Sequence, residues 1–268
     1  MPKLISIDLF ADFGMLKKPD TNEPVYLTFN MLHKPALLGI FGAIIGLKGF
    51  QKKGELPEYY NELKNLKIGI QPLNHENGNY SKTIIKYNNT TGFANEGEPY
   101  KMNGKTIKPG ETLNIVEQTL IAPAFRCYAL LNIDNKHQEK LYNNLKENKA
   151  EYLPYLGKNE FSVWWENFKE YSYEDFKPDG NFKISSIFIK EKTIKESKVE
   201  EYYDIFSDMS EKGNTFIYFE RLPVFYNEEL FQYEYKSFSF TDWTLKLKKK
   251  TEKFPLFKLI TNEIIQVF

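Results

Sequence analysis

The amino-acid sequence predicts a fold of the α+β class. In residues 1–165, strand-like segments alternate with helix-like segments, and in residues 166–268 nearly every patterned segment is strand-like. The chain has 268 residues, of which 41% are hydrophobic and 27% are charged, and this composition is ordinary for a globular protein. We therefore expect a core in residues 1–165 and a β-rich extension in residues 166–268.

The first predicted element is a strand in residues 3–10, KLISIDLF. Its apolar residues Ile5, Ile7 and Leu9 alternate with polar ones, which is typical of a strand with one buried face. A polar loop that contains Lys17 and Lys18 follows this strand.

The second predicted element is a buried helix in the segment KPALLGIFGAIIGLKGF, residues 34–50. Thirteen consecutive residues from Pro35 carry no charge, which is too few for a bilayer, because spanning it takes about 20 apolar residues. The segment matches neither the phosphate-loop pattern nor the dinucleotide-binding pattern of glycines. Pro35 suits the first turn of a helix. Glycine within a helix costs about 1 kcal/mol relative to alanine, so its three glycines, Gly39, Gly42 and Gly46, indicate close packing on a sheet or a partner. Packing on the sheet is the simpler of these two interpretations.

The next segments are a short amphipathic helix in residues 56–66 and a strand in residues 67–73. Residues 74–112 are rich in Asn, Gly and Lys, and Asn103-Gly104 is a strong signal for a hairpin turn. We expect this region to protrude from the core.

Two strands, residues 112–121 and 124–133, then meet at Ala122-Pro123. Residues 135–149 form an amphipathic helix with Leu141 and Leu145 on one face. A strand, the glycine-containing helix, several strands, a second helix and a further strand form an order that fits a ferredoxin-like sheet. Beyond this point the predicted elements are strand-like runs at residues 182–190, 215–226, 230–240, 243–249 and 263–268, with one candidate helix at residues 195–206.

Charge and chemistry-bearing residues exclude several classes of protein. The net charge is zero, so a nucleic-acid partner would have to bind a local basic patch. The single cysteine, Cys127, predicts a reducing compartment, which we take as the cytoplasm, and lies in a segment typical of a buried strand. His33, His75 and His137 are too widely spaced for a zinc site, so we expect neither a metal nor a cofactor, and no membrane segment.

Taken together, these segments resemble the CRISPR-associated Cas-five family, the Cascade subunit that caps the 5′ end of the guide RNA. The similarity is greatest to the type I-B branch and covers roughly residues 1–165. Its carriers are the opening strand with its Lys17-Lys18 loop and five further segments: KPALLGIFGAIIGL, LPEYYNELKNLKIGIQPL, YSKTIIKYNNTTGFANEGEPY, TLIAPAFRCYALLN and YLPYLGKNEF.

This resemblance implies a fold and a role. The core would be ferredoxin-like, related to the RNA-recognition motif and to the RAMP superfamily, with a β-hairpin thumb inserted at residues 74–112. The chain would be a non-catalytic subunit that grips the 5′ handle of the crRNA and joins the large subunit to the backbone subunits of Cascade. It would meet target DNA only indirectly.

The residues that would do this are cations for phosphates and flat side chains for unstacked bases. The candidates for RNA binding are Lys17, Lys18, His33, Lys34, Tyr80, Lys82, Lys86, Tyr87, Arg126 and Tyr128. Lys82 and Lys86 would share one face of a strand, and so would Arg126 and Tyr128. For each lysine the alternative is an ordinary surface charge, and for Arg126 it is an ion pair with a nearby carboxylate. Tyr155 and Lys158 are candidates for a contact with a partner, with a packed tyrosine as the alternative.

Two other functions remain open at this point. One is a metal-independent endoribonuclease, because the type I-C branch cuts the guide precursor with a Tyr, Lys and His cluster, and this chain has the dipeptides His33-Lys34 and Lys136-His137. The other is a β-rich module that binds only proteins.

Overall fold

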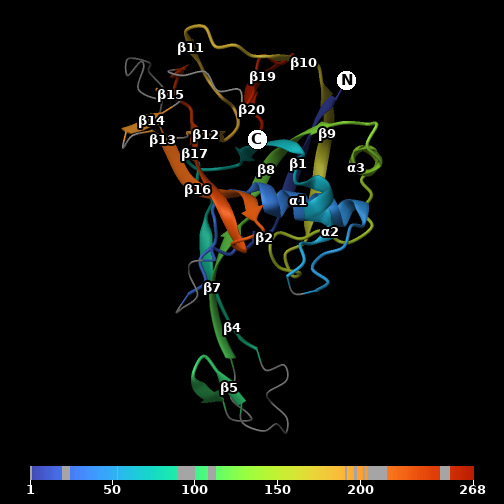
Figure 1. The fold of residues 1–268 in the computed structure, drawn as a ribbon, viewed down its shortest axis with the longest axis vertical. Coiled ribbons are helices and arrows are strands. Elements are labelled where there is room, and N and C mark those ends of the chain that lie inside the picture. Colours follow the sequence, from blue (N-terminus) through green and yellow to red (C-terminus); the bar gives the residue numbers. More distant parts are fainter. Residues whose placement is uncertain are drawn as a thin grey trace.

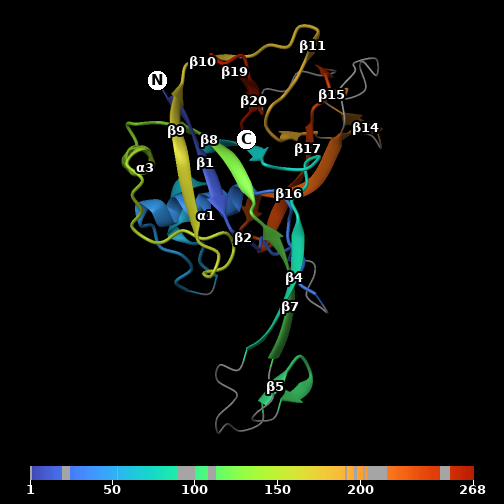
Figure 2. The same ribbon diagram turned by 180° about the vertical axis from the view of Figure 1, so that it is seen from behind.

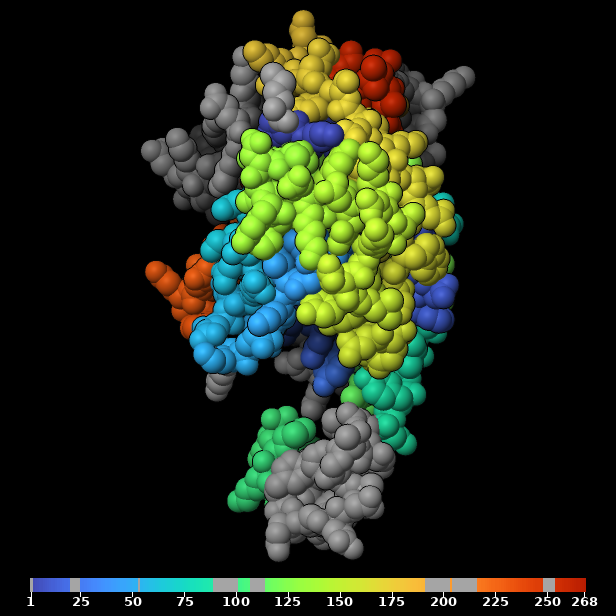
Figure 3. Space-filling model, turned by 90° about the vertical axis from the view of Figure 1, so that its right-hand side faces the viewer, coloured from blue at the N-terminus to red at the C-terminus, as the bar shows by residue number. Residues whose placement is uncertain are grey.

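The computed structural model describes residues 2–19, 25–52, 54–89, 100–107, 113–190, 192–195, 198–201, 203–204, 216–247 and 254–268. Helices and most strands form a body, from which one long β-hairpin projects (Figures 1 and 2). The space-filling view shows the same division, with the green segment of residues 100–107 standing apart from the body (Figure 3).

The centre of the body is a four-stranded antiparallel sheet with the order β3-β8-β1-β9. Its strands are β1 (Lys3–Ala11), β3 (Lys67–Leu73), β8 (Ala124–Leu131) and β9 (Val163–Tyr171). Helix α1 (Lys34–Ile45) follows β1, and α3 (Lys136–Lys146) follows β8. The sequence predicts this alternation of strands and helices, but no sequence pattern indicated a strand at residues 163–171, where β9 lies. The last strand crosses the predicted boundary between residues 165 and 166.

Both helices cover one face of this sheet. Ile5, Ile7 and Leu9 of β1 belong to the same buried cluster as the apolar side chains of α1 and of α3. Cys127 lies in this cluster, as its segment predicts, and burial raises the pKa of its thiol. The cluster also contains side chains from the C-terminal part of the chain, such as Leu222 and Phe238. The two predicted parts therefore share one core.

The opposite face of the sheet is covered in part by C-terminal strands. The middle strand of this layer is β19 (Leu256–Leu259), which pairs with β10 (Tyr173–Asp175) on one side and with β20 (Ile264–Gln266) on the other. Leu4 and Tyr128 of the central sheet pack against Phe257 and Ile265 from these strands. Aromatic side chains on this face are therefore core residues wherever the C-terminal strands lie over them.

The remaining C-terminal elements are short sheets. One consists of β12 (Phe188–Ile189), β17 (Gln232–Thr241) and β16 (Ile217–Asn227), and another of β11 (Asn181–Phe182), β18 (Leu245–Leu247) and β15 (Tyr203–Asp204). The third pairs β13 (Lys192–Lys195) with β14 (Lys198–Glu201). The helix predicted for residues 195–206 is therefore wrong in the described part of that segment, which forms strands.

The projecting hairpin is built from β4 (Lys82–Asn89) and β7 (Leu113–Ile121), with the short β2 (Phe13–Gly14) on the other edge of β7. Between them, β5 (Tyr100–Met102) and β6 (Lys105–Ile107) form the small hairpin predicted at Asn103-Gly104, and both turn residues have positive φ angles, 51° and 75°. Residues 90–99 and 108–112 of the predicted thumb lie outside the described residues. None of the helices in the described parts of the chain is long and apolar enough to cross a membrane.

The glycines of α1 have separate explanations. A Cβ at Gly42 would lie 2.3 Å from Cβ of Tyr59 on α2 (Glu58–Leu63), so this glycine allows one helix to touch the other. The close approach is thus to a second helix and not to the sheet, which corrects the simpler interpretation. Gly46 ends the helix with a left-handed conformation, at φ 81°.

An ion pair lies within the sheet, on the face away from α1 and α3. The buried carboxylate of Asp8 accepts hydrogen bonds from Nε of Arg126 at 2.7 Å, from Nη2 of the same residue at 3.0 Å and from Nδ2 of Asn167 at 3.0 Å. The carboxylate partner that the sequence offers as an alternative for Arg126 is therefore confirmed.

The contact between α1 and α2 can be tested with two glycine variants. We expect Gly42→Ala to lower the free energy of unfolding by about 1–3 kcal/mol, because the new methyl group has no space beside Tyr59. Gly39→Ala is the matched control, since its Cβ would lie 3.7 Å from the nearest atom of Tyr59. It should raise stability by up to about 1 kcal/mol through helix propensity. Urea unfolding measures both, and equal changes in the two variants would contradict the packing argument.

The ion pair on the sheet makes a second prediction. Arg126→Met leaves the Asp8 carboxylate buried without its cation, and we expect a loss of about 2–4 kcal/mol in the free energy of unfolding. The paired variant Asp8→Val/Arg126→Met removes both charges and should recover most of this loss. If the single and paired variants are equally unstable, then the uncompensated charge is not the cause.

Candidate nucleic-acid interface

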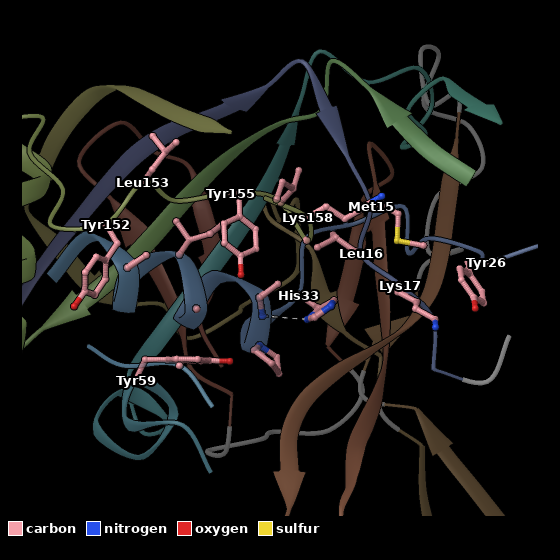
Figure 4. A pocket seen from close by; sticks show the side chains of 18 of the residues that line it. Met15, Leu16, Lys17, Tyr26, His33, Tyr59, Tyr152, Leu153, Tyr155 and Lys158 are labelled. Atoms are coloured by element: carbon pink, nitrogen blue, oxygen red, sulfur yellow. Dashed lines mark hydrogen bonds between the residues drawn. The ribbon is translucent and has the colours of Figure 1, made fainter. Parts of the chain in front are cut away.

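A groove of about 640 Å³ lies where the hairpin meets the body. Its lining comes from the loop after β2, from α1, from β4 and β7 of the hairpin, and from the turn after α3 (Figure 4). The charged and aromatic side chains that line it are Lys17, Tyr26, His33, Tyr59, Tyr87, Glu117, Tyr152, Tyr155, Lys158 and Tyr233. The groove therefore combines two lysines with six tyrosines.

Lys158 is held in the groove by an ion pair. Its Nζ atom lies 2.7 Å from Oε1 of Glu117, which is buried, and 3.0 Å from the hydroxyl of Tyr87. Burial lowers the pKa of Lys158, but the hydrogen bonds to Glu117 and Tyr87 outweigh it, so the pKa is raised and the side chain stays charged.

The turn that carries Lys158 is fixed by a glycine. Gly157 has φ 86°, and a Cβ at this position would lie 1.9 Å from the carbonyl oxygen of Met15. On the other side, the amide of Met15 donates to the carbonyl of Leu156 at 3.1 Å. Only glycine permits this approach, so the Pro- and Gly-containing segment predicted as a turn places Lys158 against the loop after β2.

Lys17 lies at the hairpin end of the groove. Its Nζ atom is 3.8 Å from the centroid of the Tyr26 ring. Tyr26 is itself attached to the hairpin, because its amide donates to Val116 at 2.9 Å and its carbonyl accepts from Gln118 at 2.8 Å. Lys17 is an exposed residue of the groove lining, with its ammonium over the Tyr26 ring.

His33 lines the groove but provides no positive charge there. It is buried at the start of α1, where its Nδ1 atom accepts the amide hydrogen of Ala36 at 3.3 Å. Burial lowers its pKa to about 3, so the ring is neutral at physiological pH.

Lys34 points away from the groove and into the core. Its Nζ atom donates to the carbonyl of Phe268 at 3.2 Å, and burial, with the charge of Lys67, lowers its pKa to about 8. The prediction that Lys34 faces the RNA path does not fit this position.

Two more of the predicted lysines belong to a network around Glu220. Its carboxylate accepts from the amides of Asn30 and Met31 at 3.0–3.2 Å and lies 3.5 Å from Nζ of Lys18. The side chain of Asn30 accepts in turn from Nζ of Lys82 at 2.7 Å. Lys18 and Lys82 therefore hold the base of the hairpin.

The hairpin itself matches the predictions in part. Lys82 and Lys86 lie on one exposed face of β4, as their spacing predicts, and Tyr87 lies on the other face. Tyr80 precedes the strand and is buried, with its hydroxyl donating to the carbonyl of Ala124. Its ring has no free face for a base, which corrects the stacking surface predicted at Tyr80.

Arg126 and Tyr128 share one face of β8, as predicted, but it is the face turned away from α1. Arg126 is paired with Asp8, and Tyr128 is fully buried with its hydroxyl donating to Gln71 at 2.9 Å. Both side chains lie on the sheet face that the C-terminal strands cover in part, and neither lines the groove. Tyr155, by contrast, lies in the groove and is 44% exposed.

Sequence reasoning missed four of the groove tyrosines, Tyr26, Tyr59, Tyr152 and Tyr233. The sequence held a signal for Tyr59, because the glycine at position 42 indicated a neighbour in close contact with the α1 backbone. It held another for Tyr152, which is in the same turn as the predicted Tyr155. Tyr26 and Tyr233 come from segments with no local pattern that indicates a site. Among the described residues, no group of three or more His, Cys, Asp or Glu side chains is placed to hold a metal ion.

Comparison with solved structures relates this fold to that of a CRISPR protein. No protein-family model matches the sequence, and no curated protein matches it. Among solved structures, the chain is similar to a CRISPR protein from Archaeoglobus fulgidus, with a TM-score of 0.50 and 12% identity over 98% of both chains. It also aligns with a chain of a CRISPR RNA-guided surveillance complex, with a TM-score of 0.47 and 12% identity over 92% of both chains. At 12% identity, the similarity to the Archaeoglobus protein concerns the fold alone. It extends over nearly the whole length of both proteins.

Proposed function

We propose that this chain is the RNA-binding subunit of a type I CRISPR Cascade complex, closest to type I-B, which grips the 5′ handle of the crRNA. In this role it joins the large subunit to the backbone subunits and contacts target DNA only through them. The observation that carries the proposal is the groove between hairpin and body, with Lys17, Lys158 and six tyrosines in its lining. The strand order β3-β8-β1-β9 supports a ferredoxin-like core, and the fold likeness to a CRISPR protein supports the family.

The groove suits a single strand better than a duplex. Single-stranded RNA is bound by cations that follow its phosphates and by aromatic rings that stack on its bases, and this groove offers both within one hollow. On the hairpin, Lys82 and Lys86 add positive charge to the face of β4 opposite Tyr87. A hairpin of this length would act as the thumb that folds over the guide.

We propose a non-catalytic role because the groove lacks a suitable base. Cleavage without a metal needs one group to take the proton of the ribose 2′-OH and another to protonate the leaving oxygen. Since Nδ1 of His33 accepts from Ala36, its neutral ring carries the proton on Nε2 and has no free lone pair. Lys158 is charged and paired with Glu117. His137 is on the first turn of α3, 3.5 Å from Glu62.

The phosphate contact at Lys17 can be tested by salt dependence. We expect Lys17→Ala to weaken binding of a repeat-derived RNA and to reduce the slope of log affinity against log salt by about 0.7, the change for one single-strand phosphate contact. Lys149→Ala is the matched control, because Lys149 is exposed and paired with Glu147 beyond the end of α3. Equal slopes for wild type and Lys17→Ala would contradict a phosphate contact there.

A second experiment separates the three functions. End-labelled repeat RNA is incubated with the protein in the absence of metal, with and without co-expressed backbone subunit. We expect a gel shift without cleavage, stronger with the backbone subunit, and no difference in cleavage between wild type and His33→Ala or His137→Ala. Cleavage at one position upstream of the handle would establish an endoribonuclease instead. No shift at low salt, together with retained binding of the large subunit, would favour a module that binds only proteins.

A further inference from the structure

One end of the groove lies over the open face of α1. We call it the tyrosine slot and define it by the six residues Ala36, Gly39, Ala43, Tyr59, Tyr152 and Tyr155. Figure 4 shows Tyr59 on one side of the helix, and Tyr152 and Tyr155 on the side of the turn after α3. Figure 3 shows the segment around residues 150–160 lying beside the segment of α1 and α2.

The floor of the slot is the least buried stripe of a helix that is otherwise within the core. Ala36, Gly39 and Ala43 lie on one face of α1 and remain partly accessible, whereas most other positions of the helix are buried. These three residues have almost no side chain, so the helix backbone forms a flat floor.

The walls of the slot are fixed to its floor. The amide of Tyr152 donates to the carbonyl of Ala43 at 3.0 Å, and the amide of Glu151 donates to that of Ile44 at 3.1 Å. On the other side, the ring of Tyr59 lies 3.7 Å from where a Cβ of Gly39 would be. The slot is therefore a formed feature of the body and does not depend on the hairpin.

The free polar groups of the slot are the hydroxyls of its three tyrosines. Within the residues that the structure describes, no hydrogen bond is made by the hydroxyls of Tyr59, Tyr152 or Tyr155, and the last two side chains are 55% and 44% exposed. Burial, with the neighbouring Tyr233 and Tyr155, raises the pKa of Tyr59 to about 12, so its hydroxyl remains a donor at neutral pH. A flat, apolar ligand with polar edges would match both the walls and these hydroxyls.

We propose that the tyrosine slot receives one unstacked nucleobase of the bound RNA, whose phosphates pass Lys17 and Lys158. This inference rests on the proposed function and adds to it a single-nucleotide site. A base has two π faces for the tyrosine rings and polar edges for their hydroxyls, and its phosphates would lie at the cationic end of the same groove. An aliphatic side chain of a protein partner would leave those hydroxyls unpaired.

The test is a series of handle RNAs, each with an abasic nucleotide at one position, bound to the protein together with its backbone subunit. One position should lose affinity on the order of tenfold when its base is removed. Ala43→Leu fills the floor of the slot, so it should weaken binding of the intact RNA by a similar factor. In this variant, the intact RNA and the RNA that is abasic at that position should bind equally. Leu230→Ala, an exposed truncation in the turn between β16 and β17, is the control and should leave the whole series unchanged.

Two variants of Tyr155 keep the test valid if Ala43→Leu does not fold. Tyr155→Ala changes an exposed ring and should give the same loss as Ala43→Leu, whereas Tyr155→Phe, which keeps the ring, should retain most of the binding. If the protein binds RNA but no single abasic position stands out, or if Ala43→Leu keeps the full difference, then the slot does not hold a base. If wild type binds no RNA even with the backbone subunit, then the proposed function is wrong as well.

Discussion

The carboxylate of Glu220 connects three parts of the chain that are far apart in sequence. It accepts the amides of Asn30 and Met31 immediately before α1, it lies beside Lys18 from the loop after β2, and it comes from β16 in the C-terminal part. Asn30 extends the network to the hairpin base through Lys82. A buried carboxylate is costly unless several donors satisfy it, so these segments have to meet in one arrangement. The groove lies between α1 and the hairpin, and its shape depends on this network.

The order of strands and helices in the core could be predicted in large part, because most of these elements have a local sequence pattern. Alternation predicted the opening strand, an uncharged run that begins with a proline predicted α1, and Asn103-Gly104 predicted the small hairpin. The covering of the far sheet face could not be predicted, since it depends on pairing between β10, β19 and β20, which lie up to about 90 residues apart. The segment at residues 195–206 has many charged residues that suit a helix, but its described part forms strands.

The candidate site was predicted less completely, for a physical reason. Lysine looks the same in a sequence whether it meets solvent or a buried acceptor, so Lys17 and Lys34 could not be distinguished, although one is exposed and the other donates to Phe268 in the core. For the same reason, the sequence could not decide whether Arg126 binds RNA or a carboxylate. The strand register decides it, because it places Asp8 directly opposite Arg126. The groove tyrosines come from five separate segments, and only the tertiary structure brings them together.

The ion pair between Lys158 and Glu117 has a consequence for the order of assembly. A cation already neutralised within the chain projects little field into the solvent, and the chain as a whole has no net charge. Long-range steering of a polyanion, which speeds association for strongly basic proteins, is therefore weak here. Retention of RNA would depend on short-range fit in the groove, while the encounter itself would be slow. In the proposed role, the chain would join a guide RNA that neighbouring subunits have already bound, so that it would enter the complex late.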